Sequence, residues 1–190
     1  MKATRILFGC LLAGMAQGQE VKDTSFAAPN GERVQRLEIV VPASVRECWD
    51  LVSTAEGWES WMSPHVEMEL RTGGKFYSNY KLGAKVGDPG TIYNTVLAYV
   101  PLQMLTLKIG LTETFPKEAR EAGTLFAVLT LEELGPKQTK LSETMVGWKD
   151  GPGWDWTYNF FLKGNRHSFE GMYKRLVSGP VNWQAQQPQK

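Results

Sequence analysis

The 190-residue sequence has little of the chemistry that marks a metal site or a hydrolase. It contains two cysteines and two histidines, without an HxxxH, CxxC or comparable spacing for metal ligands. The positions of Ser, His and Asp do not indicate a catalytic triad either. From the sequence we therefore expect no metal and no other cofactor, and we assign no catalytic set.

The chain also lacks an excess of charge of either sign. It has 21 Lys and Arg against 20 Asp and Glu, which gives a formal net charge of +1. Nucleic acids and anionic membranes attract proteins through clustered basic residues, and no such surplus is present. We therefore expect no nucleic-acid partner.

The first 18 residues differ in composition from the rest. A short basic segment, MKATR, precedes ILFGCLLAGMA, an apolar run that is short for a membrane-spanning helix. The small residues Ala16 and Gly18 follow, which is typical of a secretory signal peptide cleaved near Gly18 and Gln19. We expect a secreted or periplasmic bacterial protein without stable membrane insertion. The alternatives are an uncleaved anchor and a lipoprotein signal at Cys10, although the bulky Phe8 counts against the second.

Cleavage would change both the charge and the cysteine count. Loss of Lys2 and Arg5 leaves 19 basic and 20 acidic residues, a net charge of −1. Loss of Cys10 leaves Cys48 alone, so the mature fold has no internal disulfide and depends on its core. Cys48 belongs to an apolar helix face with Val45, Trp49 and Val52, which predicts a buried thiol.

Composition predicts one domain between two polar ends. Residues 19–32 are polar and without periodicity, which predicts a linker, and residues 178–190 form a Gln- and Pro-rich tail predicted to be disordered. Between them, from 33 to 177, we expect a first strand, two short helices, about six antiparallel strands and a long helix. The expected strands are 34–41, 65–71, 75–82, 91–100, 103–109, 125–134 and 139–148. The two short helices are expected at 45–52 and 55–62, the first with a Ser44/Glu47 capping box, and the polar connection 110–123 is a candidate for a further short helix at 117–122.

The segment RTGGKF, residues 71–76, contains two glycines before a lysine. A phosphate-binding loop would need a helix directly after it, whereas Lys75 is followed by a strand pattern. The glycines are therefore predicted to turn a hairpin.

The last element has a helical stripe. Apolar residues and one asparagine recur at intervals of four and three, at Tyr158, Leu162, Asn165, Phe169, Met172 and Leu176. Gly164 and Gly171 flank this stripe, and we expect them to allow a close approach to a sheet. The long polar segment 110–123 is a candidate lid.

Together these segments resemble the START-like (SRPBCC) superfamily, and within it the heat-shock ATPase activator homologue family. The resemblance covers nearly all of residues 33–177. It is carried by VPASVRECWDLVSTAEGWESWM, RTGGKF, GTIYNTVLAYVPLQMLTLKI, LTLEELGPKQTKLSETMVGW and the terminal helix. It implies an α+β helix-grip fold, in which a curved antiparallel sheet surrounds a long C-terminal helix and encloses a cavity. Characterised relatives bind lipids, sterols or aromatic polyketides, and some are cyclases or aromatases.

Polar residues on apolar faces are candidates for such a cavity, because burial without a partner costs about 1–3 kcal/mol. The candidates are Tyr80, Asn94, Glu143 and Asn165, and the candidate aromatic lining is Trp61, Phe76, Trp148, Tyr158 and Phe161. Ordinary internal hydrogen bonds, a misassigned strand face or plain core packing remain alternatives for each.

Three functions follow as hypotheses. The first is an exported protein that binds a small hydrophobic or aromatic molecule. The second is a cyclase- or hydrolase-type enzyme with Glu143 as general acid or base. The third is an envelope interaction module with Trp58 or Trp61 exposed on the short helices. The export signal argues against stimulation of a cytosolic chaperone.

Overall fold

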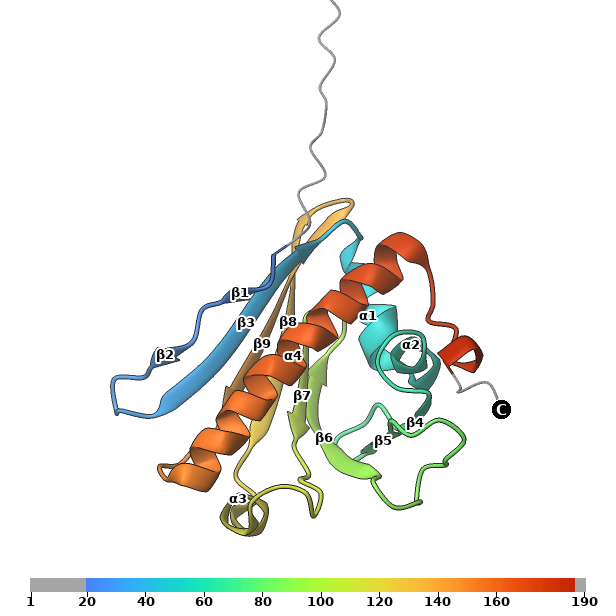
Figure 1. The fold of residues 1–190 in the computed structure, drawn as a ribbon. Coiled ribbons are helices and arrows are strands. Elements are labelled where there is room, and N and C mark those ends of the chain that lie inside the picture. The colour runs from blue at the N-terminus through green and yellow to red at the C-terminus, as the bar shows by residue number, and fades with distance from the viewer. Residues whose placement is uncertain (1–19, 187–190) are drawn as a thin grey trace, which may run out of the picture.

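The computed structural model describes residues 20–186, in which a curved antiparallel sheet is crossed by one long helix (Figure 1). The sheet has nine strands in the order β1-β3-β9-β8-β7-β6-β5-β4, with β2 paired to β3 beside this path. The strands are β1 (Lys22–Asp23), β2 (Phe26–Ala27), β3 (Arg33–Val41), β4 (His65–Met68), β5 (Lys75–Asn79), β6 (Ile92–Val100), β7 (Met104–Lys108), β8 (Phe126–Gly135) and β9 (Gln138–Val146). The helices are α1 (Val45–Ser53), α2 (Ala55–Glu59), α3 (Lys117–Ala122), α4 (Pro152–Ser178) and a 3-10 turn, η1 (Gln184–Gln186).

The topology places the first long strand beside the last one. β3 pairs with β9, and from β9 the strands follow one another in reverse chain order to β4 at the opposite edge. Helix α4 lies across one face of this sheet, and α1 and α2 cover one end (Figure 1). The predicted α+β helix-grip fold is therefore confirmed.

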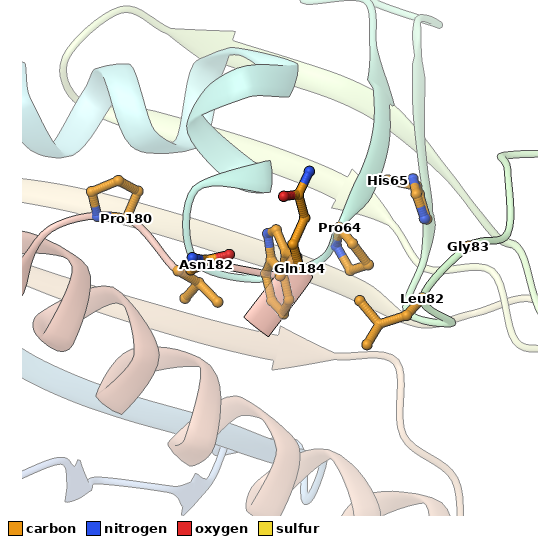
Figure 2. A pocket seen from close by; sticks show the side chains of 9 residues that line it. Pro64, His65, Leu82, Gly83, Pro180, Asn182 and Gln184 are labelled. Atoms are coloured by element: carbon orange, nitrogen blue, oxygen red, sulfur yellow. The ribbon is translucent and has the colours of Figure 1, made fainter. Parts of the chain in front are cut away.

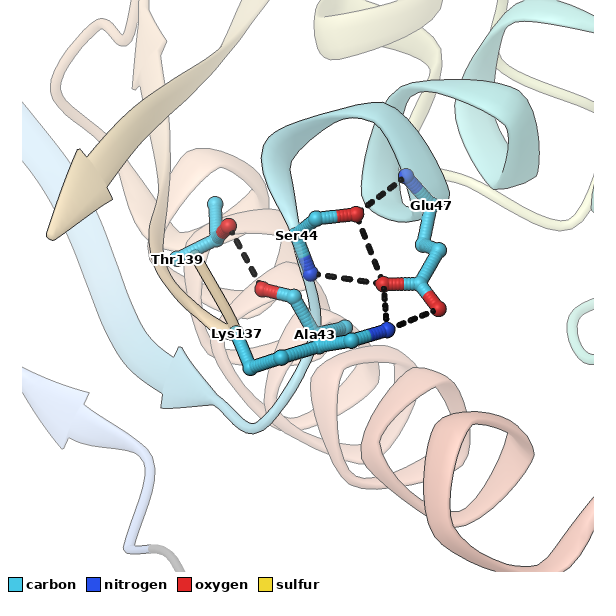
Figure 3. Close-up of polar contacts among 5 residues, drawn as sticks. All are labelled: Ala43, Ser44, Glu47, Lys137 and Thr139. Carbon is cyan, nitrogen blue, oxygen red and sulfur yellow. Dashed lines mark hydrogen bonds and ion pairs between the residues drawn. The ribbon is translucent and has the colours of Figure 1, made fainter. Parts of the chain in front are cut away.

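The start of α1 is fixed by the predicted capping box. The Ser44 hydroxyl accepts the Glu47 N–H at 3.3 Å, and Oε2 of Glu47 accepts the Ser44 N–H at 2.8 Å (Figure 3). Lys137, in the β8–β9 turn, donates to Glu47 at 2.8 Å, and Thr139 donates to the carbonyl of Ala43 at 2.8 Å. Lys137 and Ser44 lower the pKa of Glu47 to about 2. These contacts hold the helix start against the hairpin that follows β8.

Cys48 lies where its helix face predicts. Its exposed fraction is 0%, and burial raises the pKa of its thiol to about 11. A thiol held protonated in the core packs as a small apolar side chain and does not act as a nucleophile. The neighbouring Trp49 and Val52 are buried in the same core.

The RTGGKF segment turns the hairpin between β4 and β5, as predicted. Gly73 has a φ of +75°, which favours glycine. A Cβ on Gly74 would lie 2.1 Å from the carbonyl oxygen of Glu69, so this position has no room for a side chain. Strand β5 begins at Lys75, and no helix end is present there to bind phosphate.

Two segments predicted to be irregular are ordered. Residues 19–32 were expected to form a linker, but β1 and β2 within them pair with β3. The tail was expected to be disordered, but the Val181 N–H donates to the Ser60 carbonyl at 2.9 Å and the Trp183 indole donates to the Glu59 carbonyl at 2.6 Å. For residues 22–27 the cause is pairing with the edge of β3, which leaves no periodic signal in a short polar segment. The tail instead bonds to carbonyls at the C-terminal end of α2, one contact through its backbone and one through an indole. The predicted signal peptide and residues 187–190 lie outside the described residues.

Candidate ligand-binding cavity

A cavity of about 550 Å³ lies between the concave face of the sheet and helix α4. Its walls come from α1, α2, strands β5 to β9, the segment before α3, and α4. Most of the lining is apolar. A volume of this size is typical of sites for small organic ligands.

Two tryptophans of the α2 region form one aromatic wall. The rings of Trp58 and Trp61 lie 4.8 Å apart, and Trp58 is also 4.8 Å from Phe76 of β5. Both indole N–H groups are already bonded to backbone carbonyls of α1, at 2.9 and 3.1 Å. The side chains therefore offer the cavity aromatic surface and no free donor.

The same two tryptophans test the interaction-module hypothesis. Each is only 7% exposed, so the expected aromatic patch on the short helices is absent from the surface. An interface built on Trp58 or Trp61 would need the core to open.

The mouth of the cavity is lined by one flank of α4 and by the segment before α3. Phe115 and Phe160 pack at 4.8 Å, and Phe160 is 49% exposed. Gly164, one turn further along α4, lines the cavity, and a Cβ added there would meet no atom within 4 Å. The prediction that Gly164 permits close packing on the sheet was wrong, because this glycine instead leaves space at the mouth. At Gly171 a Cβ would make only ordinary contact, 3.6 Å from the Trp61 carbonyl.

Among residues 20–186, Glu143 supplies the one carboxyl on the cavity wall. It lies on β9 between Leu141 and Met145, which are both buried on the same face of the strand. Ser142 points the opposite way and donates to Glu38 at 3.2 Å, which settles the face assignment that the sequence left open. Within residues 20–186 no side chain or backbone group hydrogen-bonds to the Glu143 carboxyl. Burial raises its pKa to about 7.

Tyr80 lies just after β5 and lines the same cavity. The residue is 51% exposed because it borders the opening, and part of its side chain packs against the cavity wall. This burial, together with the charge of Glu143, raises the pKa of Tyr80 to about 12. Tyr80 is therefore a neutral hydrogen-bond donor at any physiological pH.

The two asparagines are partly satisfied by internal bonds. Asn94 Oδ1 accepts the Gly110 N–H at 2.9 Å. Asn165 Nδ2 donates to Gln35 at 3.4 Å and lies 3.1 Å from the sulfur of Met145. Gln35 in turn donates to the Tyr158 carbonyl at 2.9 Å and is 1% exposed. Gln35 was missed from the sequence, although it occupies the apolar face of β3 with Leu37 and Ile39.

The cavity gathers seven of the nine predicted residues. Those that line it are Trp61, Phe76, Tyr80, Asn94, Glu143, Phe161 and Asn165. Trp148 and Tyr158 do not line it; they pack against each other at 5.0 Å in a second core cluster near Ala119 and Trp154. Trp148 follows the end of β9 and Tyr158 lies in the N-terminal part of α4, so both are beyond the end of the cavity. Contact with a ligand stays a prediction for the seven.

Aromatic lining residues outside the predicted set are Trp58, Phe115, Phe160 and Phe169. Phe169 could have been identified from the sequence, because it belongs to the apolar helical stripe of α4. Phe115 comes from the candidate lid, and its backbone carbonyl accepts from Arg120 of α3 at 3.1 Å. The segment thus borders the cavity mouth as expected, while its movement stays a prediction.

A second, more open groove of about 610 Å³ lies beside the C-terminal segment (Figure 2). Its lining residues are Pro64, His65, Leu82, Gly83, Pro180, Val181, Asn182, Trp183 and Gln184. The buried Nε2 of His65 has no hydrogen-bond partner in residues 20–186. No three His, Cys, Asp or Glu side chains of the described chain gather in a way that would hold a metal ion. None of the helices in this part of the chain is long and apolar enough to cross a bilayer.

Several solved structures share this fold. Protein MLL2253 from Mesorhizobium loti aligns with a TM-score of 0.61 at 18% identity, over 78% of this chain and 100% of that one. CalU16 from Micromonospora echinospora aligns with a TM-score of 0.61 at 18% identity, over 90% and 91%. The Aha1 dimer structure from Colwellia psychrerythraea gives 0.58 at 14% identity, over 77% and 97%. At these identities the likeness shows the fold alone.

Sequence comparison gives the family. No curated protein matches the chain. Residues 34–178 match the family described as polyketide cyclase / dehydrase and lipid transport, and this range agrees closely with the domain expected at 33–177. The match covers most of the chain and every element from β3 to α4. The chain therefore belongs to the polyketide cyclase / dehydrase and lipid transport family and carries a START-like domain.

Proposed function

We propose that this protein is exported and binds a small hydrophobic or aromatic molecule in the cavity between the sheet and α4. The observation that carries the proposal is a hollow of about 550 Å³ inside the core, walled by aromatic rings instead of being filled by them. Protein interiors are otherwise closely packed, so an apolar hollow of this size favours an occupant. The family description, which includes lipid transport, points in the same direction.

Export rests on the first 18 residues alone. Their basic start, apolar run and small residues before Gln19 support a secreted or periplasmic location. Fractionation of the native host, followed by sequencing of the mature N-terminus, tests this part. A mature chain that begins near Gln19 would support it, and an intact Met1 in the cytosol would refute it.

The binding proposal is tested by native mass spectrometry of residues 19–190, purified gently from the compartment in which they accumulate. We expect a discrete added mass that is lost on denaturation. A Gly164→Leu variant should lose this mass, since its side chain would narrow the mouth at a site where a Cβ meets no atom. Lys163→Leu, at the exposed neighbouring position, is the matched control and should keep it.

A second candidate function is acid–base catalysis on the bound molecule. Glu143 favours it, because an unpaired carboxyl with a pKa of about 7 can both give and take a proton at neutral pH. Cyclase and dehydrase are the enzyme classes in the family description. Catalysis predicts that Glu143→Gln retains a molecule of a different mass from that released by the wild type. The same mass in both proteins would leave binding as the function.

A further inference from the structure

The charge of the cavity lining is one-sided. Among the described residues that line it there is no Lys, no Arg and no Asp, while Glu143 supplies one carboxyl. The other titratable groups that face the cavity are Tyr80, beyond β5, and His167, on α4 at the mouth. An ionised ligand would therefore meet one acidic group in the interior and no fixed positive charge.

The carboxyl also lacks an internal partner. Buried charges are normally paired, and an unpaired carboxylate in an apolar site is destabilising. Asn165, which lines the same cavity, does not relieve it, because its amide nitrogen is directed to Gln35 and Met145. A bound cation would supply the missing partner.

The rest of the lining suits the same ligand. Aromatic rings attract cations through their faces, and this cavity is walled by rings from three parts of the fold. They come from the α2 region at Trp58 and Trp61, from β5 at Phe76, and from α4 at Phe161 and Phe169. Because both indole N–H groups are occupied by backbone carbonyls, a ligand meets ring surface there.

We propose that the ligand is a hydrophobic organic cation, whose protonated nitrogen pairs with Glu143 while its apolar or aromatic body lies against the aromatic walls. This inference rests on the proposed binding function and narrows its ligand class. It also excludes a class, since an anionic amphiphile such as a free fatty acid would bring a second negative charge to a site that has no Lys or Arg.

The proposal predicts that the affinity of the cavity for an organic cation rises with pH. Glu143, with a pKa of about 7, is mostly protonated at pH 5.5 and mostly ionised at pH 8.5. A primary alkylammonium stays charged throughout, as a lysine does with its pKa of about 10.4. If the ionised site alone binds the cation, affinity rises by up to about 30-fold over this range. Tyr80 stays neutral over this range. His167 also lines the mouth, so its contribution is separated from that of Glu143 by mutation.

The test uses three probes that share a ten-carbon chain and differ in their head group, namely decylammonium, decan-1-ol and decanoate. Their binding to the full mature chain is measured by titration calorimetry at pH 8.5. We expect decylammonium to bind at least about tenfold more tightly than the alcohol, because a charge-assisted bond replaces a neutral one. Decanoate should bind most weakly. Glu143→Gln should abolish the preference for the ammonium, and Glu133→Gln, at an exposed position of β8, should preserve it.

Each outcome separates this inference from the function beneath it. Equal binding of all three probes, or tighter binding of decanoate, overturns the cation inference and leaves the binding cavity standing. Binding of none of them, together with no retained native mass, overturns both. In the wild type the pH dependence of decylammonium affinity should arise from Glu143, so His167→Gln should show the same dependence. If that variant loses it, the assignment to Glu143 is wrong.

Discussion

Glu143 should make the empty protein less stable as the pH rises from 5 to 8, and Glu143→Gln should remove this effect. Burial raises the pKa of the carboxyl from about 4.5 to about 7 in the folded state. Between these values the folded protein holds a proton that the unfolded chain has released. The folded state then binds more protons, so the free energy of unfolding falls as the pH increases.

The size of the effect follows from the same difference. A pKa raised to about 7 corresponds to a loss of at most about 3 kcal/mol in the free energy of unfolding. This full loss is reached above pH 7, where the carboxyl is ionised in both the folded and the unfolded state. Glu143 is half-buried by its accessible surface, and this partial exposure reduces the limit, so we expect about 1–2.5 kcal/mol between pH 5 and pH 8. Below the unfolded pKa both states are protonated and the contribution disappears.

Urea denaturation followed by tryptophan fluorescence measures the effect at pH 5, 6, 7 and 8, with ligand removed. Other titrating groups act in both proteins, so the difference between the wild type and Glu143→Gln isolates one carboxyl. Glu133→Gln, which changes an exposed acid, should show the same change in the free energy of unfolding with pH as the wild type. If Glu143→Gln also runs parallel, the carboxyl is solvated in the folded state, and the physical basis for the site is wrong.

Four other substitutions test the packing and the local structure, each by the same denaturation measurement. Leu141→Ala removes a fully buried side chain and should lower stability by about 2–4 kcal/mol; a loss under about 1 kcal/mol would contradict its place in the core. Ser44→Ala removes the helix cap and should lower stability by about 1 kcal/mol, and no change would mean that the capping box is dispensable. Gly147→Ala should destabilise by more than about 1 kcal/mol, because φ is +92° and its Cβ would lie 1.8 Å from the Thr124 carbonyl. Gly164→Ala should instead stabilise α4 by up to about 1 kcal/mol, and a loss there would show that the position is crowded.

Most helices and strands could be predicted from local sequence patterns. The strands that were missed form only by pairing with a distant part of the chain. The capping box at Ser44, the short helix at 117–122 and the break before α4 are each specified within a few residues, and the structure confirms them. Strands β1 and β2 exist only because the edge of β3 offers unpaired backbone groups, which no pattern within residues 22–27 records.

The site was predictable to the same extent. Strand alternation placed Glu143 with Leu141 and Met145, and this face turns out to line the cavity. Trp148 was assigned to the site as an aromatic residue near this strand, although alternation puts it on the opposite face from Glu143, with Ser142 and Val146. It lies beyond the end of β9, in the second core cluster. Gly164 was misjudged because the sequence shows a small residue on a helix but not whether a sheet or an open mouth faces it.

The two candidate functions make opposite demands on Glu143, and this offers a way to separate them. A bound cation stabilises the carboxylate, so it would lower the pKa of Glu143 towards its ordinary range and suppress proton donation. A neutral ligand would exclude water further and hold the pKa near or above 7, where the group can act as an acid or a base. The pKa of Glu143 in the occupied cavity, measured by NMR titration of its labelled carboxyl, therefore decides between them. A fall on binding supports a carrier of cations, and a rise supports catalysis on a neutral substrate.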